Sequence, residues 1–284
     1  MASAFEYDET ITKAACGPNV TDMFYTYCEC TSLTGSPVCG PNVTTMDYTY
    51  YNCYNLTGQP VCGNRVATMS FTYAECHNLT GSPVCGNIVT DMSATYEYCY
   101  NLTGQPVCGN SVVNMSFTYD GCRNLTGSPV CGDKVTDMGY TYRGCSNLTG
   151  NPVCGPSVTN MRNTYSNCVK LTGNPVCGNN VTTMYDTYSG CTNLSSNGYF
   201  YSNKITNVRN CFYGRYTSKR LNLYVPENGT PLTTCLSSTA STSLTGTNIT
   251  WTRDTANNRH YNTAQNIYIY PVANVEQVYN NNEK

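Results

Sequence analysis

Residues 33–53 read LTGSPVCGPNVTTMDYTYYNC, and a similar sequence, LTGQPVCGNRVATMSFTYAEC, follows 23 residues later at 56–76. No insertion breaks this spacing as far as Leu194. The invariant positions form columns whose members are 23 residues apart: Cys16, Cys39, Cys62, Cys85, Cys108, Cys131, Cys154 and Cys177; Met23, Met46, Met69, Met92, Met115, Met138, Met161 and Met184; a Tyr column from Tyr27 to Tyr188; a second Cys column from Cys30 to Cys191; and a Leu column from Leu33 to Leu194.

A unit of this length cannot bury its own apolar side chains, but stacked units can, because each column lies against its copy in the next turn. A period of 23 residues lies within the range of leucine-rich repeats. Turns joined by parallel strands are about 4.8 Å apart, so eight turns predict a rod roughly 35–40 Å long. We therefore expect a leucine-rich-repeat solenoid.

The segment L-T-G-x-P-V-C is expected to form the strand of each turn, so that a parallel β-ladder covers one face. Its x position is polar and variable, as in Ser36, and should face water. Because side chains alternate along a strand, Pro37 and Cys39 should then point inward and Val38 outward.

The return path of each turn carries Val43, Met46 and Tyr50, at spacings of three and four residues. This spacing is typical of a short helical or 3-10 segment, which we expect opposite the strand.

The pattern C-x-N-L…P-x-C-G…V-T-x-M…T-Y-x-x-C resembles the BspA-like, or treponemal-type, leucine-rich repeat over about residues 16–225. Pro37 and Cys39 stand where that family has two Ile, Gly40 replaces its Pro, and Thr49-Tyr50 replaces its Ala-Phe. The resemblance implies a solenoid on a surface protein that binds host proteins or cells.

The two ends depart from the repeat, as expected of terminal units that cap a core. Ile205, Val208 and Phe212 continue the Val, Met and Tyr columns after a one-residue insertion, and 221–226 and 266–271 read as strands. Thr230-Pro231 is expected to start a short helix. The predicted organisation is an N-terminal lid (1–15), eight repeats (16–197), a degenerate ninth repeat (198–220), a small β-containing C-terminal cap (221–272) and a flexible tail (273–284).

The composition argues against several classes of partner. Charged residues are 11% of the chain and the net charge is -2, which predicts no nucleic-acid binding. No apolar run approaches the roughly 18 residues that a membrane span needs. Arg209, Arg215, Lys219 and Arg220 form the one local basic cluster, interpreted as a solvated turn. Residues 1–13 do not read as a secretory signal.

The polar and sulfur-containing side chains give no enzymatic motif, and we expect no cofactor and no metal site. The cysteines are interpreted as buried free thiols, with disulfides between turns and a metal site as less favoured alternatives, and with Cys28 as an exposed exception. His77 and His260 are expected on the solvated surface. The column Asn55, Asn78, Asn101, Asn124, Asn147 and Asn193 is interpreted as a ladder that hydrogen-bonds between turns, although each member also fits a glycosylation sequon.

The variable positions are the candidates for binding, because the invariant columns are committed to packing. Two strips qualify. An aromatic strip comprises Tyr25, Tyr48, Phe71, Phe117 and Tyr140, which either pack at the edge of the core or form a binding surface. An outward Val ladder comprises Val38, Val61, Val84 and Val107, which could pair chains into a homo-oligomer.

The first functional hypothesis is a non-catalytic recognition or adhesion protein, extracellular or on a virion surface, that binds a cell-surface protein or carbohydrate. The second is a structural component of a bacteriophage tail or virion that contacts the host cell. The segment 266–276 resembles the endings of repeat proteins encoded by gut phages. The absence of a recognisable signal favours the phage hypothesis, because virions leave by lysis.

Overall fold

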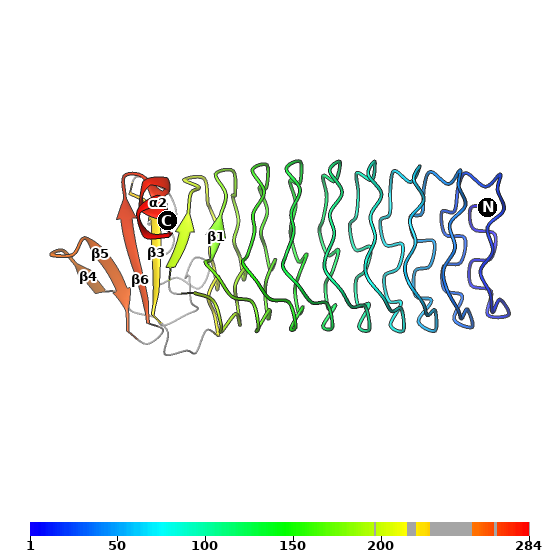
Figure 1. The fold of residues 1–284 in the computed structure, drawn as a ribbon. Coiled ribbons are helices and arrows are strands. Elements are labelled where there is room, and N and C mark those ends of the chain that lie inside the picture. Colours follow the sequence, from blue (N-terminus) through cyan, green and yellow to red (C-terminus); the bar gives the residue numbers. More distant parts are fainter. Residues whose placement is uncertain (196, 215–219, 228–251, 264–265, 284) are drawn as a thin grey trace.

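The computed structural model describes residues 1–195, 197–214, 220–227, 252–263 and 266–283. Its first two hundred residues wind through successive coils set in a row, and the strands gather at the C-terminal end of that row (Figure 1). The strands form an open, mostly parallel, mixed sheet of six strands in the order β1-β2-β3-β6-β5-β4. The elements are β1 (Val176–Cys177), β2 (Asn197–Phe200), β3 (Leu221–Pro226), β4 (Thr252–Asp254), β5 (Arg259–Asn262), β6 (Ile267–Val272) and the helix α2 (Val275–Glu283).

Residues 23 positions apart lie side by side in neighbouring coils. Parallel bridges join Thr45 to Thr68 and Thr68 to Asp91, and the series continues to Thr183. The period seen in the sequence is therefore the length of one coil.

The return path of each coil is a chain of tight turns and not the predicted helix. The N–H of Thr49 donates to Met46 O at 3.0 Å, and that of Tyr51 to Tyr48 O at 3.3 Å. The N–H groups between them donate instead to the next coil, as from Tyr50 to Thr72 O at 2.9 Å. Because every second N–H is used between coils, neither the consecutive i to i−4 bonds of an α-helix nor the consecutive i to i−3 bonds of a 3-10 segment can form.

The predicted strand of the L-T-G-x-P-V-C segment is also wrong for most coils. Pro37 has no N–H, and the backbone of Val38 bonds to Tyr50 of its own coil: Val38 N donates to the Tyr50 hydroxyl at 3.0 Å, which donates to Val38 O at 2.7 Å. The same bonds join Val176 of β1 to Tyr188, so they do not by themselves prevent a ladder. Within the described residues, the segment pairs as a strand only at β1, where Tyr199 N of β2 donates to Pro175 O at 2.9 Å and Tyr201 N to Cys177 O at 3.0 Å.

The side-chain alternation predicted for this segment holds in its first half. Ser36 is exposed and Pro37 is buried, as predicted. Val38 and Cys39 are both half-buried, so the strict alternation ends before them. The inward cysteines are those of the second column, such as Cys53, which is fully buried.

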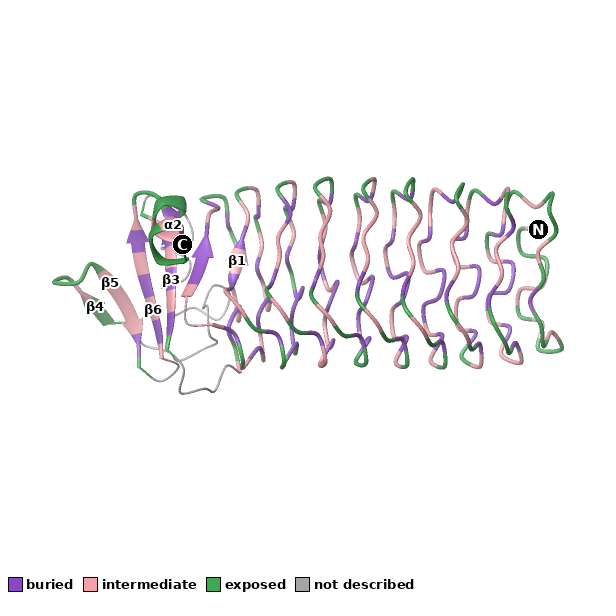
Figure 2. Ribbon diagram, in the orientation of Figure 1, coloured by how far each residue is buried: buried purple, intermediate pink, exposed green. Residues whose placement is uncertain are grey.

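The core follows the remaining invariant columns. Val43, Met46, Tyr50, Cys53 and Leu56 are fully buried, as are their copies in the following coils, and Figure 2 shows the buried positions repeating along the row. The tyrosine rings stack with centroids 5.4 to 5.6 Å apart. Such offset pairs contribute about 0.5–1.5 kcal/mol each beyond their burial.

Buried polar groups in the core are bonded between coils. Thr49 Oγ1 contacts Met46 O at 2.7 Å and Met23 O at 2.8 Å, and Cys53 Sγ donates to Tyr27 O at 2.9 Å. Each thiol or hydroxyl thus satisfies a carbonyl that a buried coil would otherwise leave without a partner.

The N-terminal segment adds a further coil to the row, where a lid was expected. Phe5 stacks on Tyr27 at 5.4 Å, so it extends the tyrosine column, and its N–H donates to Thr26 O. Tyr7 N donates to Cys28 O at 2.8 Å. Cys28 is consequently buried, and its predicted exposure is wrong.

The other end continues the columns and then closes with the sheet. Phe212 stacks on Tyr188 at 5.6 Å, and Ile205 and Val208 are buried. The predicted strands 221–226 and 266–271 correspond to β3 and β6.

The segment expected to be a flexible tail instead forms α2. Its Glu283 Oε1 accepts hydrogen bonds from Tyr199 Oη at 2.7 Å and Asn197 Nδ2 at 3.1 Å, which hold the helix against β2. The helix predicted at 230–235 lies outside the described residues. Where the structure is described, it contains no helix long and apolar enough to cross a membrane.

Candidate functional site

The aromatic strip predicted from the sequence lies on the face of the coils that their tight turns form, here called the turn face, and it is interrupted at one coil. Tyr25 stacks on Tyr48 with centroids 4.6 Å apart, and Tyr48 stacks on Phe71 at 4.7 Å. Phe117 stacks on Tyr140 at 4.5 Å. All five rings are half-buried, so the strip both packs on the edge of the core and meets solvent.

The coil between Phe71 and Phe117 has Ala94 at the equivalent position, and this residue is buried. The strip therefore consists of two stacks, one of three rings and one of two. Phe24 and Tyr51 widen the first stack by edge-on contacts: Phe24 with Tyr25 at 4.5 Å, and Tyr51 with Phe71 at 6.3 Å.

Every residue of the strip has a backbone in the left-handed region. The φ angle is 54° at Phe71, 59° at Phe117 and 61° at Tyr140. Bulky residues rarely adopt this conformation, which Asn tolerates much better. Later coils do place Asn in this column, at Asn163 and Asn210, with φ of 55° and 56°. The backbone therefore gives no reason for the aromatic side chains.

A charged cluster lies beside the break in the strip. Arg143 Nε and Nη2 contact the two carboxylate oxygens of Asp120 at 2.8 and 2.5 Å, and Nη2 donates to Tyr98 Oη at 3.1 Å. Glu97 occupies the same position as Asp120 one coil earlier. Burial, with the nearby charges of Asp120 and Glu75, raises the pKa of Glu97 to about 7.

The C-terminal end of the strip changes from aromatic stacks to alternating arginine and tyrosine. The Arg162 guanidinium lies 5.6 Å from the Tyr140 ring centroid and 4.9 Å from that of Tyr185. Arg209 lies 5.8 Å from Tyr185 on the other side. The three residues line a hollow of about 490 Å³ together with Asn160, Thr183 and Asn207.

Sequence reasoning placed Arg209 in a solvated turn and did not select Arg162 or Tyr185. Arg220, from the same basic cluster, lies 3.8 Å from the Tyr268 ring centroid and donates to Asn222 Oδ1 at 2.8 Å. Arg215 and Lys219 lie outside the described residues. These residues could have been found from one variable column of the repeat. It holds the small residues Ser93, Ser116 and Gly139 and then changes to Arg162, Tyr185 and Arg209.

The Val ladder lies across the coil from the aromatic strip. Val61, Val84 and Val107 are half-buried like Val38, and each has its backbone N–H and C=O bonded to a core tyrosine hydroxyl. The backbone of these valines therefore has no free N–H or C=O group with which a second chain could form a β-ladder. Its role in pairing chains remains a prediction.

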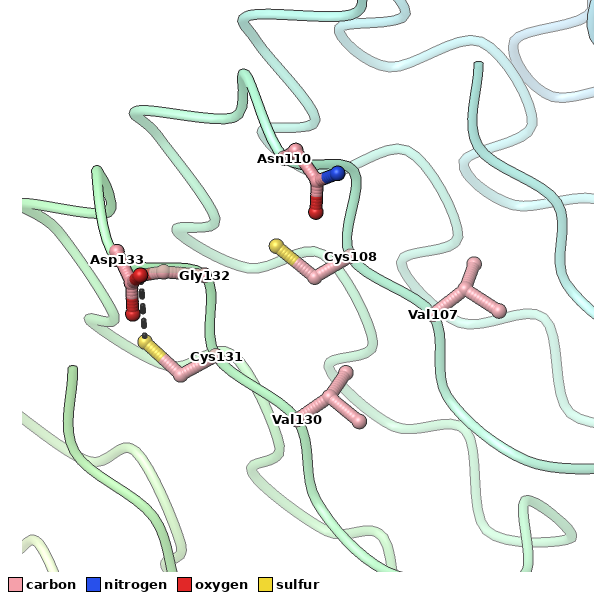
Figure 3. A pocket seen from close by; sticks show the side chains of 7 residues that line it. All are labelled: Val107, Cys108, Asn110, Val130, Cys131, Gly132 and Asp133. Atoms are coloured by element: carbon pink, nitrogen blue, oxygen red, sulfur yellow. Dashed lines mark hydrogen bonds between the residues drawn. The ribbon is translucent and has the colours of Figure 1, made fainter. Parts of the chain in front are cut away.

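The first cysteine column lies next to the Val ladder. Figure 3 shows a shallow hollow where Cys108 and Cys131 follow Val107 and Val130 in adjacent coils, with both thiols pointing the same way. Burial raises the pKa of Cys62 to about 11 and those of Cys85 and Cys131 to about 12. These thiols are therefore protonated near neutral pH.

The asparagine column does bond between coils, but to backbone carbonyls more than to stacked amides. Asn55 Nδ2 donates to Thr31 O at 2.9 Å and Asn193 Nδ2 to Val169 O at 2.8 Å, whereas Asn101 Nδ2 is 3.5 Å from Asn78 Oδ1. In these coils the backbone carbonyl of the neighbouring coil is the nearer acceptor.

The two histidines have side-chain partners, where only solvation was expected. His77 Nε2 lies 2.8 Å from Glu75 Oε2, and His260 Nε2 lies 2.8 Å from Arg253 Nη1. Within the described part of the chain, no three His, Cys, Asp or Glu side chains are grouped to hold a metal ion.

The aromatic strip and the arginine–tyrosine hollow are thus the candidate functional surface. In comparisons with protein-family models, with curated proteins and with solved structures, this chain matches none.

Proposed function

We propose that the 23-residue coils form a leucine-rich-repeat-type solenoid that serves as a non-catalytic recognition protein, displayed on a cell surface or a virion. The aromatic strip of Tyr25, Tyr48, Phe71, Phe117 and Tyr140 is its contact surface for a cell-surface glycan or protein. As an adhesin or as a virion component, the chain would use the same surface.

One observation carries this proposal: half-buried aromatic side chains occupy a left-handed backbone column where later coils use Asn. Non-Gly residues held in such regions cost of order 1–3 kcal/mol each. Ring stacking offsets about 0.5–1.5 kcal/mol of this per pair, and the partial burial of the rings offsets a further part. Aromatic residues are enriched among binding hot spots, which supplies a reason for them.

The rest of the coil supports the same assignment by elimination. The hydroxyl of Tyr73 bonds both backbone groups of Val61, and the thiol of Cys76 bonds Tyr50 O. Such invariant groups are buried and satisfied internally, which leaves the variable turn face to contact a ligand.

The test replaces Phe71, Phe117 and Tyr140 together by Asn, the residue that Asn163 and Asn210 supply at equivalent positions. The control variant replaces Val61, Val84 and Val107 by Thr on the opposite face. Binding of fluorescently labelled protein to whole bacterial and host cells is measured, together with the thermal unfolding of each variant.

We expect the Asn variant to unfold within a few degrees of the parent and to lose cell binding, whereas the Thr variant still binds. Pre-treating the cells with protease or periodate then distinguishes a protein ligand from a glycan. Undiminished cell binding by the Asn variant would contradict the proposal.

A further inference from the structure

The end of the strip at Arg162, Tyr185 and Arg209 differs from the rest of the turn face in its charge. Among the described residues, carboxylates pair with Arg143 and Arg259, whose partners are Asp120 and Asp254. Neither Arg162 nor Arg209 has such an ion pair in that part of the chain. The tyrosine rings hold these two guanidiniums in place but do not neutralise them.

Two acids lie near the hollow, and within the described part of the chain neither forms an ion pair with its arginines. Asp186 follows Tyr185, and its carboxylate bonds to the side chains of Tyr185 and Asn210. Burial raises the pKa of Asp186, although both arginines act against that shift. Asp137 accepts from Asn160 Nδ2 at 2.9 Å beside the hollow, and it too forms no ion pair with either arginine among the described residues. Both guanidiniums are therefore left without a paired carboxylate, on a chain whose total charge is -2.

The floor of the hollow adds neutral hydrogen-bonding groups. Asn160, Thr183 and Asn207 stand on three successive coils, joined by parallel bridges. Asn207 Oδ1 accepts from Arg209 N at 3.0 Å, which fixes that amide and leaves its NH₂ group for a ligand. The Thr183 hydroxyl has no hydrogen bond to another described residue. A ligand that suits this hollow carries hydroxyl groups beside an anionic group.

We propose that the hollow at Arg162, Tyr185 and Arg209 binds the anionic group of an acidic saccharide, a carboxylate or a sulfate ester. The guanidiniums donate charge-assisted hydrogen bonds to the anion, while Thr183 and Asn207 contact sugar hydroxyls. This inference rests on the proposed recognition function and names the ligand class for one end of the strip.

The test uses three polymers with one backbone: dextran, carboxymethyl-dextran and dextran sulfate. Binding of the full chain is measured by biolayer interferometry at low and at physiological salt. The variant R162Q/R209Q removes both charges from the hollow. The control R65Q/K134Q removes two charges from exposed positions of a column that does not line the hollow.

We expect the parent and the control to bind one or both charged dextrans, and to bind neutral dextran at least about tenfold more weakly. R162Q/R209Q should lose about tenfold or more of that affinity, because both charged donors to the anion are removed. The preference between carboxymethyl-dextran and dextran sulfate identifies the anion. Added salt should weaken binding of the parent.

Four results would overturn the assignment. In the first, the parent binds neither charged dextran; in the second, it binds neutral dextran as tightly as the charged ones. In the third, the R65Q/K134Q control loses as much affinity for the charged dextrans as R162Q/R209Q does; in the fourth, the parent binds single-stranded DNA as tightly as the charged dextrans. Failure of the proposed function would be seen in a different experiment. In that case the variant with Asn in place of Phe71, Phe117 and Tyr140 would still bind cells, whereas the dextran results for R162Q/R209Q would stay as expected.

Discussion

The hydroxyl of each core tyrosine connects the two faces of its coil. In the fifth coil, counting the N-terminal coil as the first, Tyr96 Oη accepts from Val84 N at 3.0 Å and donates to Val84 O at 2.8 Å. We expect Tyr96→Phe to lower the free energy of unfolding by about 1–3 kcal/mol, because both Val84 groups lose their partner. Urea unfolding measures the loss.

The matched control is Tyr140→Phe, which removes a hydroxyl from the half-buried strip. That hydroxyl does not bond the backbone of the opposite face, so its removal should change unfolding by less than about 0.5 kcal/mol. Equal losses in the two variants would show that the hydroxyl of Tyr96 does not act as described.

Glu97 should make stability depend on pH near neutrality. Its pKa in the folded protein, about 7, lies above the value of about 4.3 for an unperturbed Glu. The folded protein therefore holds this proton more tightly than the unfolded chain does. The resulting stabilisation is fully present below about pH 4.3 and is lost as the pH rises through about 7.

Thermal unfolding from pH 5 to pH 8 tests this expectation. The parent should lose stability between pH 5 and 7.5, and Glu97→Gln should reduce that loss. If both proteins show the same slope, the carboxyl of Glu97 is not held in its neutral form by the fold.

At the level of single residues, the sequence predicted the core well and the surface incompletely. The columns of Val, Met, Tyr and Leu and the second Cys column were expected inside because they repeat without exception, and they are inside. The first Cys column was also expected inside, but it is half-buried except at Cys177. The role of Phe5 was missed because it precedes Tyr27 by 22 residues and not by 23. Arg162 and Tyr185 were missed because a variable column shows its continuity only after the coils are stacked.

The two cysteine columns of the repeat should differ in reactivity. Thiols such as Cys62 and Cys85 are half-buried at the surface, whereas Cys53 and Cys76 are fully buried and donate hydrogen bonds to backbone carbonyls. Under native conditions at pH 8.5, iodoacetamide should modify the Cys62 column slowly and the Cys53 column hardly at all. Denatured protein should react at both.

Peptide mass spectrometry after timed alkylation gives the rate at each site. Cys28, buried under the N-terminal coil, belongs with the protected set. Native modification of Cys53 or Cys76 as fast as that of Cys62 would contradict the burial of the second column.

The elements of the coil were harder to predict than its core, for two physical reasons. A chain of tight turns places side chains at spacings of three and four residues, so Val43, Met46 and Tyr50 gave the periodicity of a helix. The segment containing Pro37 and Val38 has the composition of a strand, but its Val38 bonds to the Tyr50 hydroxyl and most coils form no strand there, whereas Val176 of β1 pairs with β2 although it bonds to Tyr188 in the same way. That side-chain bond runs across the coil and leaves no mark in the local sequence.

At the scale of the molecule, the coils depend on one another through register. Each coil contributes N–H groups to the next, as from Met69 to Asp91 O at 3.0 Å and from Phe71 to Ser93 O at 2.9 Å. The ends close this series differently: Phe5 extends the tyrosine column at one end, and at the other β2 pairs with β3. A deletion should therefore be tolerated only when it removes a whole coil.

The most direct test of this account compares two deletions by near-ultraviolet circular dichroism of the stacked tyrosines during thermal unfolding. Deleting residues 78–100 joins His77 to Asn101 in register and removes the coil that carries Ala94. Deleting residues 78–88 removes about half a coil and shifts polar positions into the core. We predict that the first protein unfolds cooperatively within several degrees of the parent, and that the second shows no cooperative transition. Cooperative unfolding of both proteins, or of neither, would contradict the claim that columns in a 23-residue register form the core.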